Sequence, residues 1–253
     1  MAETPKWKVC WITGASGGIG RELSLRLAER GVKVAATARS ADKLEALAGA
    51  HPNITAFPAD VTDPKALAGA VSKIEQELGP IDLAILAAGV YAPFDPDNID
   101  LEGFHRTSAV NIDGVANALA AVLPGMRQRG RGQLAIMGSL FGYCGLPGNG
   151  SYGASKAYLI NLAQSLELEL GPKGIQVTLV NPGFVDTPLN ASYDRPKYFV
   201  MKPSKAARRI VEGLEKGGFE VAFPGRVAAF FKTVKALPNG AMFWLLRRGL
   251  MRD

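Results

Sequence analysis

The stretch Thr13-Gly14-Ala15-Ser16-Gly17-Gly18-Ile19-Gly20 follows the apolar run 9–13 and leads into a segment of helical period. Glycine allows a tight turn and a close approach of the backbone to a bound group. The free N–H groups and the positive dipole end at the start of the next helix favour an anion. The stretch therefore predicts a strand, a phosphate-binding turn and a helix. A turn with a purely structural role is the alternative.

Beyond this turn, short apolar runs alternate with segments of helical period. This alternation predicts a parallel sheet with helices on both faces. We expect an α/β fold, a single-domain Rossmann-type doubly wound sheet of about seven strands, spanning residues 1–253. The expected strands are 9–13, 32–37, 54–58, 81–88, 133–137, 175–181 and 220–223. The expected helices run from the Gly-rich turn to Gly31, over 41–50, from Pro64 with Asp63 as N-cap, and over 99–126, 151–170 and 204–216 with Ser204 as N-cap.

The composition excludes several classes of protein. Two cysteines, Cys10 and Cys144, cannot form a disulfide framework, and two histidines, His51 and His105, offer little for a zinc site or a Ser-His-Asp triad. We expect no metal and a reducing compartment. The first residues do not read as a secretory leader, and the apolar run 241–246 has six residues, whereas a bilayer-spanning helix needs about 20. These features predict a cytoplasmic protein with no membrane-spanning segment.

Tyr152 and Lys156 are four residues apart on an expected helix, so their side chains share one face. A free phenol has a pKa of about 10. A nearby ammonium, together with the positive nicotinamide of an oxidised cofactor, favours the phenolate and lowers that value. Ser139 follows the fifth strand, where its hydroxyl can polarise a substrate oxygen. The spacing predicts a catalytic group, and a core tyrosine beside a solvated lysine is the alternative.

The motif T-G-x-x-x-G-x-G at Gly14, Gly18 and Gly20, followed in order by Asn111, Ser139 and Tyr152-x-x-x-Lys156, resembles the short-chain dehydrogenase/reductase family over residues 7–223. Asn181-Pro182-Gly183 and Thr187 are similar to the family's segment beside the nicotinamide. The resemblance implies hydride transfer between nicotinamide and a carbonyl or alcohol carbon, with Tyr152 as proton donor and acceptor. It also implies that Asn111 orders a water linking Lys156 to solvent, and that the protein is a homodimer or homotetramer.

One departure from the family pattern lies after the fourth strand. This chain reads Leu86-Ala87-Ala88-Gly89 where members often have Asn-Asn-Ala-Gly. We expect the change to alter the packing of the sheet and the adenosine more than the chemistry.

The residues after the second strand indicate which cofactor binds. An acidic side chain there would accept hydrogen bonds from an unphosphorylated ribose, but this chain has Ala38 and Arg39. A guanidinium suits a 2′-phosphate. NADP(H) is the preferred cofactor, NAD(H) stays open, and a merely solvated Arg39 is the alternative. The expected cofactor-binding residues are Gly14, Ser16, Gly18, Ile19, Gly20, Arg39, Asp60, Val61, Ala88, Gly89, Tyr152, Lys156, Pro182, Gly183, Val185 and Thr187.

The segment 181–203 contains Pro188, Tyr193, Tyr198 and Phe199 and is long enough to cover a substrate. Residues 140–147 are apolar or small and contain no arginine or lysine to clamp an anion. We expect a hydrophobic small-molecule carbonyl or alcohol. Because a fold can host unrelated functions, an NADP(H)-binding regulator or scaffold without turnover is the competing hypothesis.

The C-terminal extension 226–253 has six basic residues against one acid, Asp253. Its aromatic and aliphatic side chains are suited to a membrane interface, giving peripheral membrane contact as one hypothesis. Packing against a partner subunit or over the substrate pocket is the other. Nucleic acid is not expected, since no recognition motif accompanies the charge. The apolar residues in question are Phe230, Phe231, Phe243, Trp244, Leu245, Leu246, Leu250 and Met251.

Overall fold

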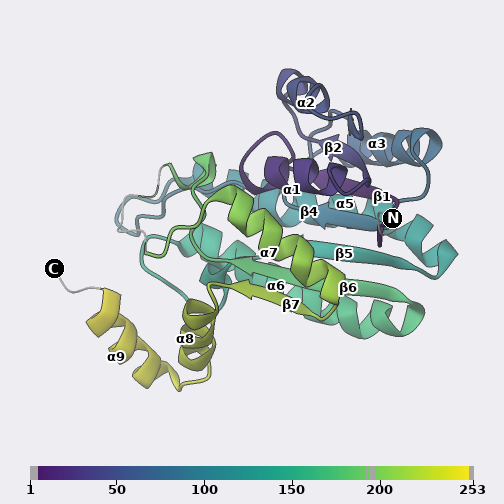
Figure 1. The fold of residues 1–253 in the computed structure, drawn as a ribbon. Coiled ribbons are helices and arrows are strands. Elements are labelled where there is room, and N and C mark those ends of the chain that lie inside the picture. The colour runs from purple at the N-terminus through teal and green to yellow at the C-terminus, as the bar shows by residue number, and fades with distance from the viewer. Residues whose placement is uncertain (1–4, 192, 194–197, 251–253) are drawn as a thin grey trace.

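The computed structural model describes residues 5–191, 193 and 198–250 (Figure 1). Its centre is a parallel sheet of seven strands in the order β3-β2-β1-β4-β5-β6-β7. This arrangement confirms the predicted doubly wound α/β fold. The strands are β1 (Val9–Thr13), β2 (Lys33–Thr37), β3 (Ile54–Ala56), β4 (Leu83–Leu86), β5 (Gly132–Met137), β6 (Ile175–Pro182) and β7 (Glu220–Phe223).

Helices connect the strands and cover both faces of the sheet. The α-helices are α1 (Gly18–Ala28), α2 (Ala41–Ala48), α3 (Pro64–Glu77), α4 (Leu101–Ser108), α5 (Gly114–Arg129), α6 (Gly150–Leu170), α7 (Pro203–Lys216), α8 (Gly225–Lys235) and α9 (Asn239–Leu250). Shorter turns of helix are the π-helical η1 (Ala109–Asp113) and the 3₁₀ segments η2 (Leu140–Gly142), η3 (Gly171–Lys173) and η4 (Pro188–Asn190).

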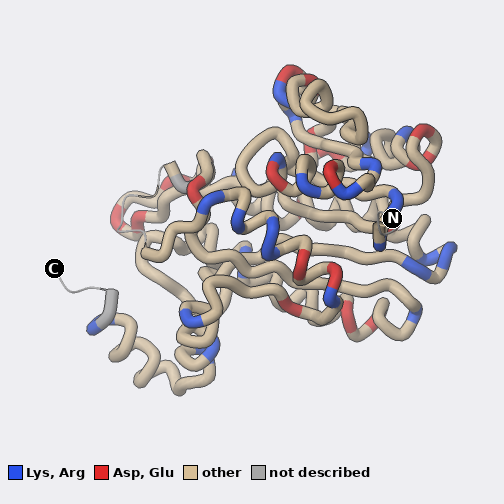
Figure 2. The backbone as a smooth tube through the Cα atoms, viewed as in Figure 1, with Lys and Arg blue, Asp and Glu red and all other residues tan. Residues whose placement is uncertain are grey.

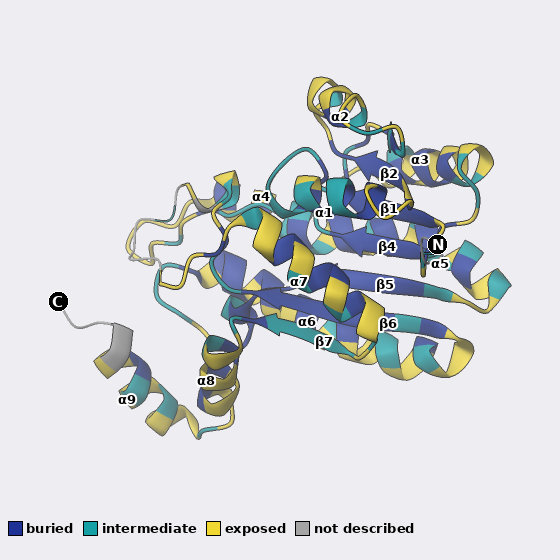
Figure 3. Cartoon of the chain, in the orientation of Figure 1, coloured by how far each residue is buried: buried dark blue, intermediate teal, exposed yellow. Residues whose placement is uncertain are grey.

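Two hydrophobic cores lie on opposite faces of the sheet, as the dark strands in Figure 3 show. Alternate residues of a strand point to opposite faces. Accordingly, Val9 and Trp11 of β1 pack into the core beneath α3, α5 and α6, whereas Cys10 and Ile12 pack into the core beneath α1, α2 and α7. Because both faces are covered, the central strands are mostly apolar instead of alternating between apolar and polar residues.

The strand order reverses between β1 and β4, which are neighbours although two strands separate them in sequence. In such sheets the connections at the carboxyl ends diverge at the reversal and leave a crevice for a ligand. The Gly-rich turn after β1 and the segment after β4 meet at this point. Thr13 Oγ1 accepts hydrogen bonds from the N–H groups of Ala87 at 3.1 Å and Ala88 at 3.2 Å.

Three strands are shorter than predicted. β4 ends at Leu86 rather than 88 because Ala87 and Ala88 donate to the Thr13 side chain instead of to a strand. β2 begins at Lys33 rather than 32 because the N–H of Val32 donates to Leu27 O at the end of α1. β3 ends at Ala56 rather than 58, and Pro58 has no N–H for the ladder.

The predicted helix 99–126 is divided by the π-helical turn η1, and the helical run continues to Arg129. At this turn the N–H of Gly114 donates to Ala109 O, five residues back. A π-turn adds one residue to the helix, often at a functional site, and periodicity does not reveal it.

Helix ends also differ from the prediction. Ser204 is not the N-cap of α7, because Pro203 takes the first helical position and Lys202 precedes it. α1 ends at Ala28, although Gly31 does take a left-handed conformation with φ of 82°. α2 ends at Ala48 rather than 50.

By length and composition alone, the 29-residue run Leu101–Arg129 could cross a membrane. The sequence prediction considered only uninterrupted apolar residues, so it did not identify this run, whose apolar residues are interrupted by polar ones. In the fold, its residues Val115, Leu119, Val122 and Met126 are buried in the core beneath α5. Covering one face of the sheet accounts for its apolar composition.

The C-terminal extension forms α8, which lies beside the end of β7, and α9, which lies farther from the sheet beyond α8 (Figure 1). Ala228 and Phe231 of α8 join the core on one face of the sheet, and Leu246 of α9 is buried. In contrast, Phe230 and Trp244 are about half exposed. Met251, one of the apolar residues noted above, lies outside the described residues.

Asp63 should stabilise α3 measurably. Its carboxylate accepts hydrogen bonds from the N–H groups of Lys65 at 2.9 Å and Ala66 at 3.0 Å. Replacing an N-cap carboxylate by alanine costs about 1 kcal/mol. We expect Asp63→Ala to lower the free energy of unfolding by this amount in urea denaturation, whereas Asp63→Asn keeps most of the stability. Equal stability of Asp63→Ala and the parent would contradict the cap.

Candidate active site

A cavity of about 360 Å³ opens at the carboxyl edge of the sheet, around the reversal between β1 and β4. It runs from the end of β2 past the Gly-rich turn to α6 and the segment after β6. All the residues predicted to bind the cofactor line it, namely Gly14, Ser16, Gly18, Ile19, Gly20, Arg39, Asp60, Val61, Ala88, Gly89, Tyr152, Lys156, Pro182, Gly183, Val185 and Thr187. The structure therefore brings together residues from six separate stretches of sequence.

The Gly-rich turn is shaped for backbone contact. Gly14 has a φ of 72°, and a Cβ there would lie 2.8 Å from the backbone N of Ala88. A Cβ on Gly20 would collide with the carbonyl of Gly14. The N-cap of α1 is Gly17, so no side chain covers the first N–H groups of this helix. These groups fit the pyrophosphate of a dinucleotide, which a helix N-terminus and close-lying glycines bind.

Ser139, Tyr152 and Lys156 line the other part of the cavity. Tyr152 and Lys156 lie in the first two turns of α6, and both are buried. The Nζ of Lys156 lies 5.6 Å from the centroid of the Tyr152 ring and donates to Met137 O at 2.8 Å. Ser139 lies two residues after β5, close enough to Tyr152 for its hydroxyl to lower the pKa of the phenol. The three side chains can thus surround one substrate oxygen.

Asn111 does not line the cavity. It lies in the π-turn η1 and is fully buried, where its side chain accepts from Val90 N at 2.8 Å and donates to Val90 O and Ser155 Oγ at 3.0 Å each. It therefore ties the segment after β4 to α6, beside Lys156. Its role in ordering a water stays a prediction.

Comparison with known proteins decides the family. Residues 8–197 match the family described as short chain dehydrogenase. The chain belongs to this family.

Its relatives include enzymes and structures of similar length. An uncharacterized oxidoreductase of Myxococcus xanthus is 36% identical over 243 residues, which are 94% of this chain and 96% of that protein. The 3-oxoacyl-(acyl-carrier-protein) reductase FabG of Escherichia coli is 32% identical over 245 residues, 93% of this chain and 97% of the relative. The crystal structure of a short-chain dehydrogenase from Streptomyces avermitilis has a TM-score of 0.80 and 26% identity and covers 97% of this chain and 95% of that one.

Membership makes this chain an oxidoreductase that acts on CH–OH or C=O groups of small molecules with NAD(P). This confirms the predicted enzyme class. In this short-chain dehydrogenase, Tyr152 and Lys156 have shifted pKa values, and the two ends of the cavity differ in charge and polarity.

Burial controls the acid-base properties of the catalytic group. It raises the pKa of Tyr152 to about 12. The hydroxyl of Ser139 lowers this pKa, but by less than burial raises it. Burial lowers the pKa of Lys156 to about 8. Without cofactor, loss of solvation therefore dominates the pKa of Tyr152. The lowering expected beside Lys156 and the oxidised nicotinamide stays a prediction. Tyr152 is a protonated phenol at neutral pH.

The far end of the cavity carries positive charge. Arg39 and Ser40, after β2, and Lys43, in the first turn of α2, line it. The Nη1 of Arg39 lies 4.0 Å from Oδ2 of Asp60, and its side chain is 69% exposed. Sequence reasoning missed Lys43, although its position one helical turn after Arg39 was the available signal.

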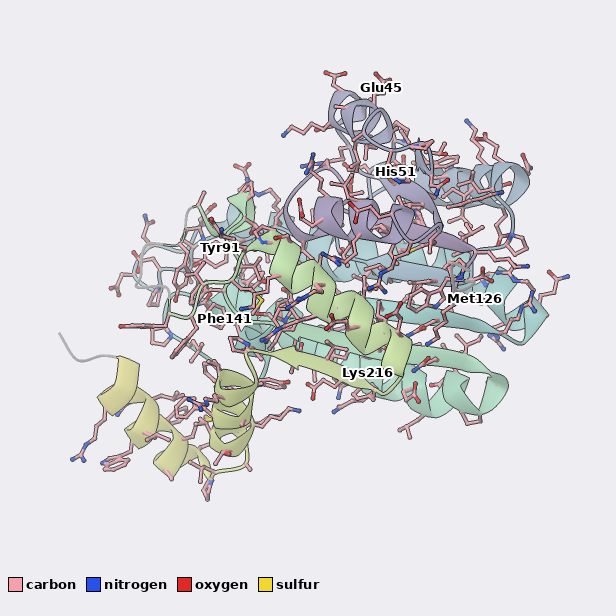
Figure 4. The ribbon with its side chains drawn as sticks, in the orientation of Figure 1. Glu45, His51, Tyr91, Met126, Phe141 and Lys216 are labelled. Atoms are coloured by element: carbon pink, nitrogen blue, oxygen red, sulfur yellow. The ribbon has the colours of Figure 1, made fainter. Side chains whose placement is uncertain are left out.

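Aromatic side chains wall the catalytic end. The Tyr91 ring packs edge-on against Tyr152 at a centroid distance of 5.4 Å and against Tyr193 at 5.8 Å. Phe184 lies 5.0 Å from Tyr193 and 5.2 Å from Phe141. Figure 4 shows Tyr91 and Phe141 at the same end of the molecule, far from Met126.

The segment 181–203, predicted to cover the substrate, contributes only some of its residues to the cavity wall. Pro188 and Tyr193 of the segment 181–203 line the cavity, whereas Tyr198 and Phe199 are 64% and 73% exposed. Tyr91 and Phe184 were not predicted. They lie five and two residues after the ends of β4 and β6, in segments at the carboxyl edge of the sheet, and this position was the signal for them.

A polar network holds the segment after β6 in place. The Nδ2 of Asn181 donates to Tyr143 Oη at 3.1 Å and to Glu220 Oε1 at 2.8 Å, and Tyr143 and Lys232 also donate to Glu220. Burial would raise the pKa of Glu220, but these three hydrogen bonds together lower it. The network links α8 to the residues Pro182 and Gly183 that line the cavity.

The pKa of Lys156 has a consequence for stability. Between its folded value of about 8 and its ordinary value of 10.5, the unfolded chain binds more protons than the folded one. The free energy of unfolding contributed by this group therefore rises with pH in this window, by on the order of 3 kcal/mol. We expect the parent to gain this stability over Lys156→Met between pH 8 and pH 10.5, in urea denaturation at each pH. Parallel pH profiles for the two proteins would contradict a buried ammonium.

Proposed function

We propose that this short-chain dehydrogenase is an NADP(H)-dependent oxidoreductase that interconverts a hydrophobic carbonyl compound and its alcohol. One observation carries the proposal: Ser139, Tyr152 and Lys156 line the same cavity as the Gly-rich turn, with Arg39 and Lys43 at its opposite end. A protein that only holds the cofactor would have no need for an acid-base group at this place. Residues 1–253 act as one dinucleotide-binding and catalytic domain.

The chain's own residues manage the proton and the oxygen. When bound, the nicotinamide supplies or accepts the hydride. The hydroxyl of Ser139 holds the substrate oxygen, and Tyr152 donates its proton to that oxygen in the direction of reduction. A phenol with a pKa of about 12 is protonated before the reaction. Lys156 stabilises the phenolate that results, and with a pKa of about 8 it exchanges its own proton near neutrality.

The cofactor preference rests on charge. Arg39 and Lys43 offer two cations where a 2′-phosphate would lie, and Ala38 leaves space beside them. Asp60 is close enough to Arg39 to orient the guanidinium. NAD(H) lacks this phosphate and gains nothing from the two cations, so NADP(H) is preferred over NAD(H).

The substrate preference rests on the aromatic wall. Tyr91, Phe141, Phe184 and Tyr193 surround Tyr152 or lie beside Ser139, and their rings favour an apolar substrate. The similarity to a 3-oxoacyl-(acyl-carrier-protein) reductase supports reduction of a carbonyl group as the direction.

Assembly and location complete the proposal. Leu101 on α4 and Leu168 on α6 are 64% and 79% exposed, which supports a homodimer or homotetramer of the kind common in the family. Cys10 and Cys144 are free thiols, which supports a reducing, cytoplasmic environment.

Tyr152→Phe tests the catalytic assignment. The change removes one hydroxyl and keeps the ring that packs against Tyr91. We expect turnover to fall at least roughly 100-fold, the lower range for general acid-base catalysis, with NADPH affinity nearly unchanged. Turnover is followed by absorbance of the reduced nicotinamide over a panel of ketones, aldehydes and alcohols.

Tyr158→Phe is the matched control, because Tyr158 lies on the same helix and is 46% exposed. It should keep full turnover. Retained turnover in Tyr152→Phe would remove Tyr152 from its role. Silence of the parent across the panel, with tight cofactor binding, would favour a regulator or scaffold.

Arg39→Ala/Lys43→Ala tests the cofactor preference. Loss of two charge-assisted contacts should raise the Kd for NADPH roughly 10- to 100-fold and leave the Kd for NADH nearly unchanged. Lys65→Ala/Lys73→Ala on α3 removes the same charge away from the cavity and serves as control. Equal or tighter binding of NADH by the parent, measured by titration, would refute the assignment.

A further inference from the structure

The exposed face of the last two helices has a distinct chemistry. We call it the tail surface and define it by Phe230 on α8 and by Phe243, Trp244, Arg247 and Arg248 on α9. The three aromatic side chains are 46%, 50% and 56% exposed. α9 lies at the outside of the molecule, reached through α8, so its exposed face has no neighbour among the described residues (Figure 1).

The helical phase of α9 separates a packed face from this surface. Leu246 is buried, and Met242 and Leu245 are partly covered on the same side. Phe243 and Arg247 form one pair four residues apart on the opposite side, and Trp244 and Arg248 form the other. The Cζ of Arg248 lies 4.3 Å from the centroid of the Trp244 ring. On α9, Trp244 thus contacts Arg248, and Phe243 lies one helical turn before Arg247 on the same exposed side.

The charge of this region has one sign. Residues 225–250 contain five basic residues and no acidic one, and Figure 2 shows blue without red along α8 and α9. Lys232 is neutralised by Glu220 of β7. Within the described residues, no ion pair involves Arg226, Lys235, Arg247 or Arg248.

Two other uses of the tail surface fit less well. It does not cover the substrate, because the residues lining the cavity end at Tyr193. A symmetric dimer through this face would bring identical surfaces together. The arginines of one copy would then face those of the other, with no acidic residue of this region to match them.

An anionic lipid bilayer matches both features. Tryptophan and phenylalanine rings enter the boundary between headgroups and acyl chains, and arginines bind the lipid phosphates. We propose that the tail surface binds the protein peripherally to anionic membranes. α8 begins at the carboxyl end of β7, so this surface lies toward the edge of the sheet where the cavity opens. The proposal is independent of the reaction catalysed.

The chain carries its own probe for the test. Of its three tryptophans, Trp7 and Trp11 are 4% and 0% exposed, so a change of emission on adding vesicles reports on Trp244. We expect the protein to sediment with phosphatidylcholine vesicles containing one third phosphatidylglycerol, with a blue shift of its emission. Neutral phosphatidylcholine vesicles should bind it far less, and high salt should weaken binding to the anionic ones.

Two double variants separate the aromatic and the charged contributions. Arg247→Gln/Arg248→Gln should weaken binding to anionic vesicles roughly 25-fold, at about fivefold for each basic side chain. Phe243→Ser/Trp244→Ser should weaken it at least about 10-fold. The controls are Lys65→Gln/Lys73→Gln on α3, which removes the same charge, and Ile99→Ser before α4, which removes an apolar side chain that is 51% exposed. Circular dichroism and NADPH binding confirm that each variant folds.

Absence of binding to anionic vesicles at low salt overturns the proposal. So does equal binding by the parent and both tail variants. If light scattering without lipid shows self-association that Phe243→Ser/Trp244→Ser abolishes, and vesicles do not bind the parent, then the tail surface belongs to a second copy of the chain and the proposal is likewise wrong.

Discussion

The close contact between the turn after β1 and the end of β4 is the constraint on which the site depends. Gly14 lies so near the backbone of Ala88 that a Cβ would collide with it, and Thr13 Oγ1 binds the N–H groups of both Ala87 and Ala88. This contact joins the two halves of the sheet at the reversal of strand order. It leaves the N-terminus of α1 facing the cavity, and it places Gly89 next to Lys156 and Asn111.

Burial gives the catalytic end of the cavity its chemistry. In water, the pKa of a lysine and the pKa of a tyrosine are both about 10, well above neutral pH. Here the loss of solvation raises the pKa of Tyr152 and lowers the pKa of Lys156. Tyr152 therefore gives up its proton less readily than a tyrosine in water, and Lys156 gives it up more readily than a lysine in water. The carbonyl of Met137 keeps the ammonium in place. The pair therefore combines a phenol that keeps its proton at neutral pH with an amine whose pKa is about 8.

The cavity and the tail surface divide their tasks along the molecule. Cations collect after β2, and aromatic rings collect in the segments after β4, β5 and β6, so one elongated cavity has a charged end and an apolar end. The network around Glu220 connects the apolar end to α8 through Asn181, Tyr143 and Lys232. α8 in turn carries α9, so the position of the tail surface is tied to the residues that line the cavity.

Local patterns in the sequence determined the strand and helix order, the phosphate turn and the spacing of Ser139, Tyr152 and Lys156, because periodicity, glycine content and helical spacing are short-range properties. Tertiary structure decided the rest. The π-turn that holds Asn111, the early end of β4, the place of Lys43 and the packing of Tyr91 on Tyr152 all depend on contacts between distant segments. The pKa of Tyr152 is the clearest case: the position of Lys156 follows from spacing along a helix, whereas desolvation depends on everything that packs around the ring and is the largest influence on this pKa.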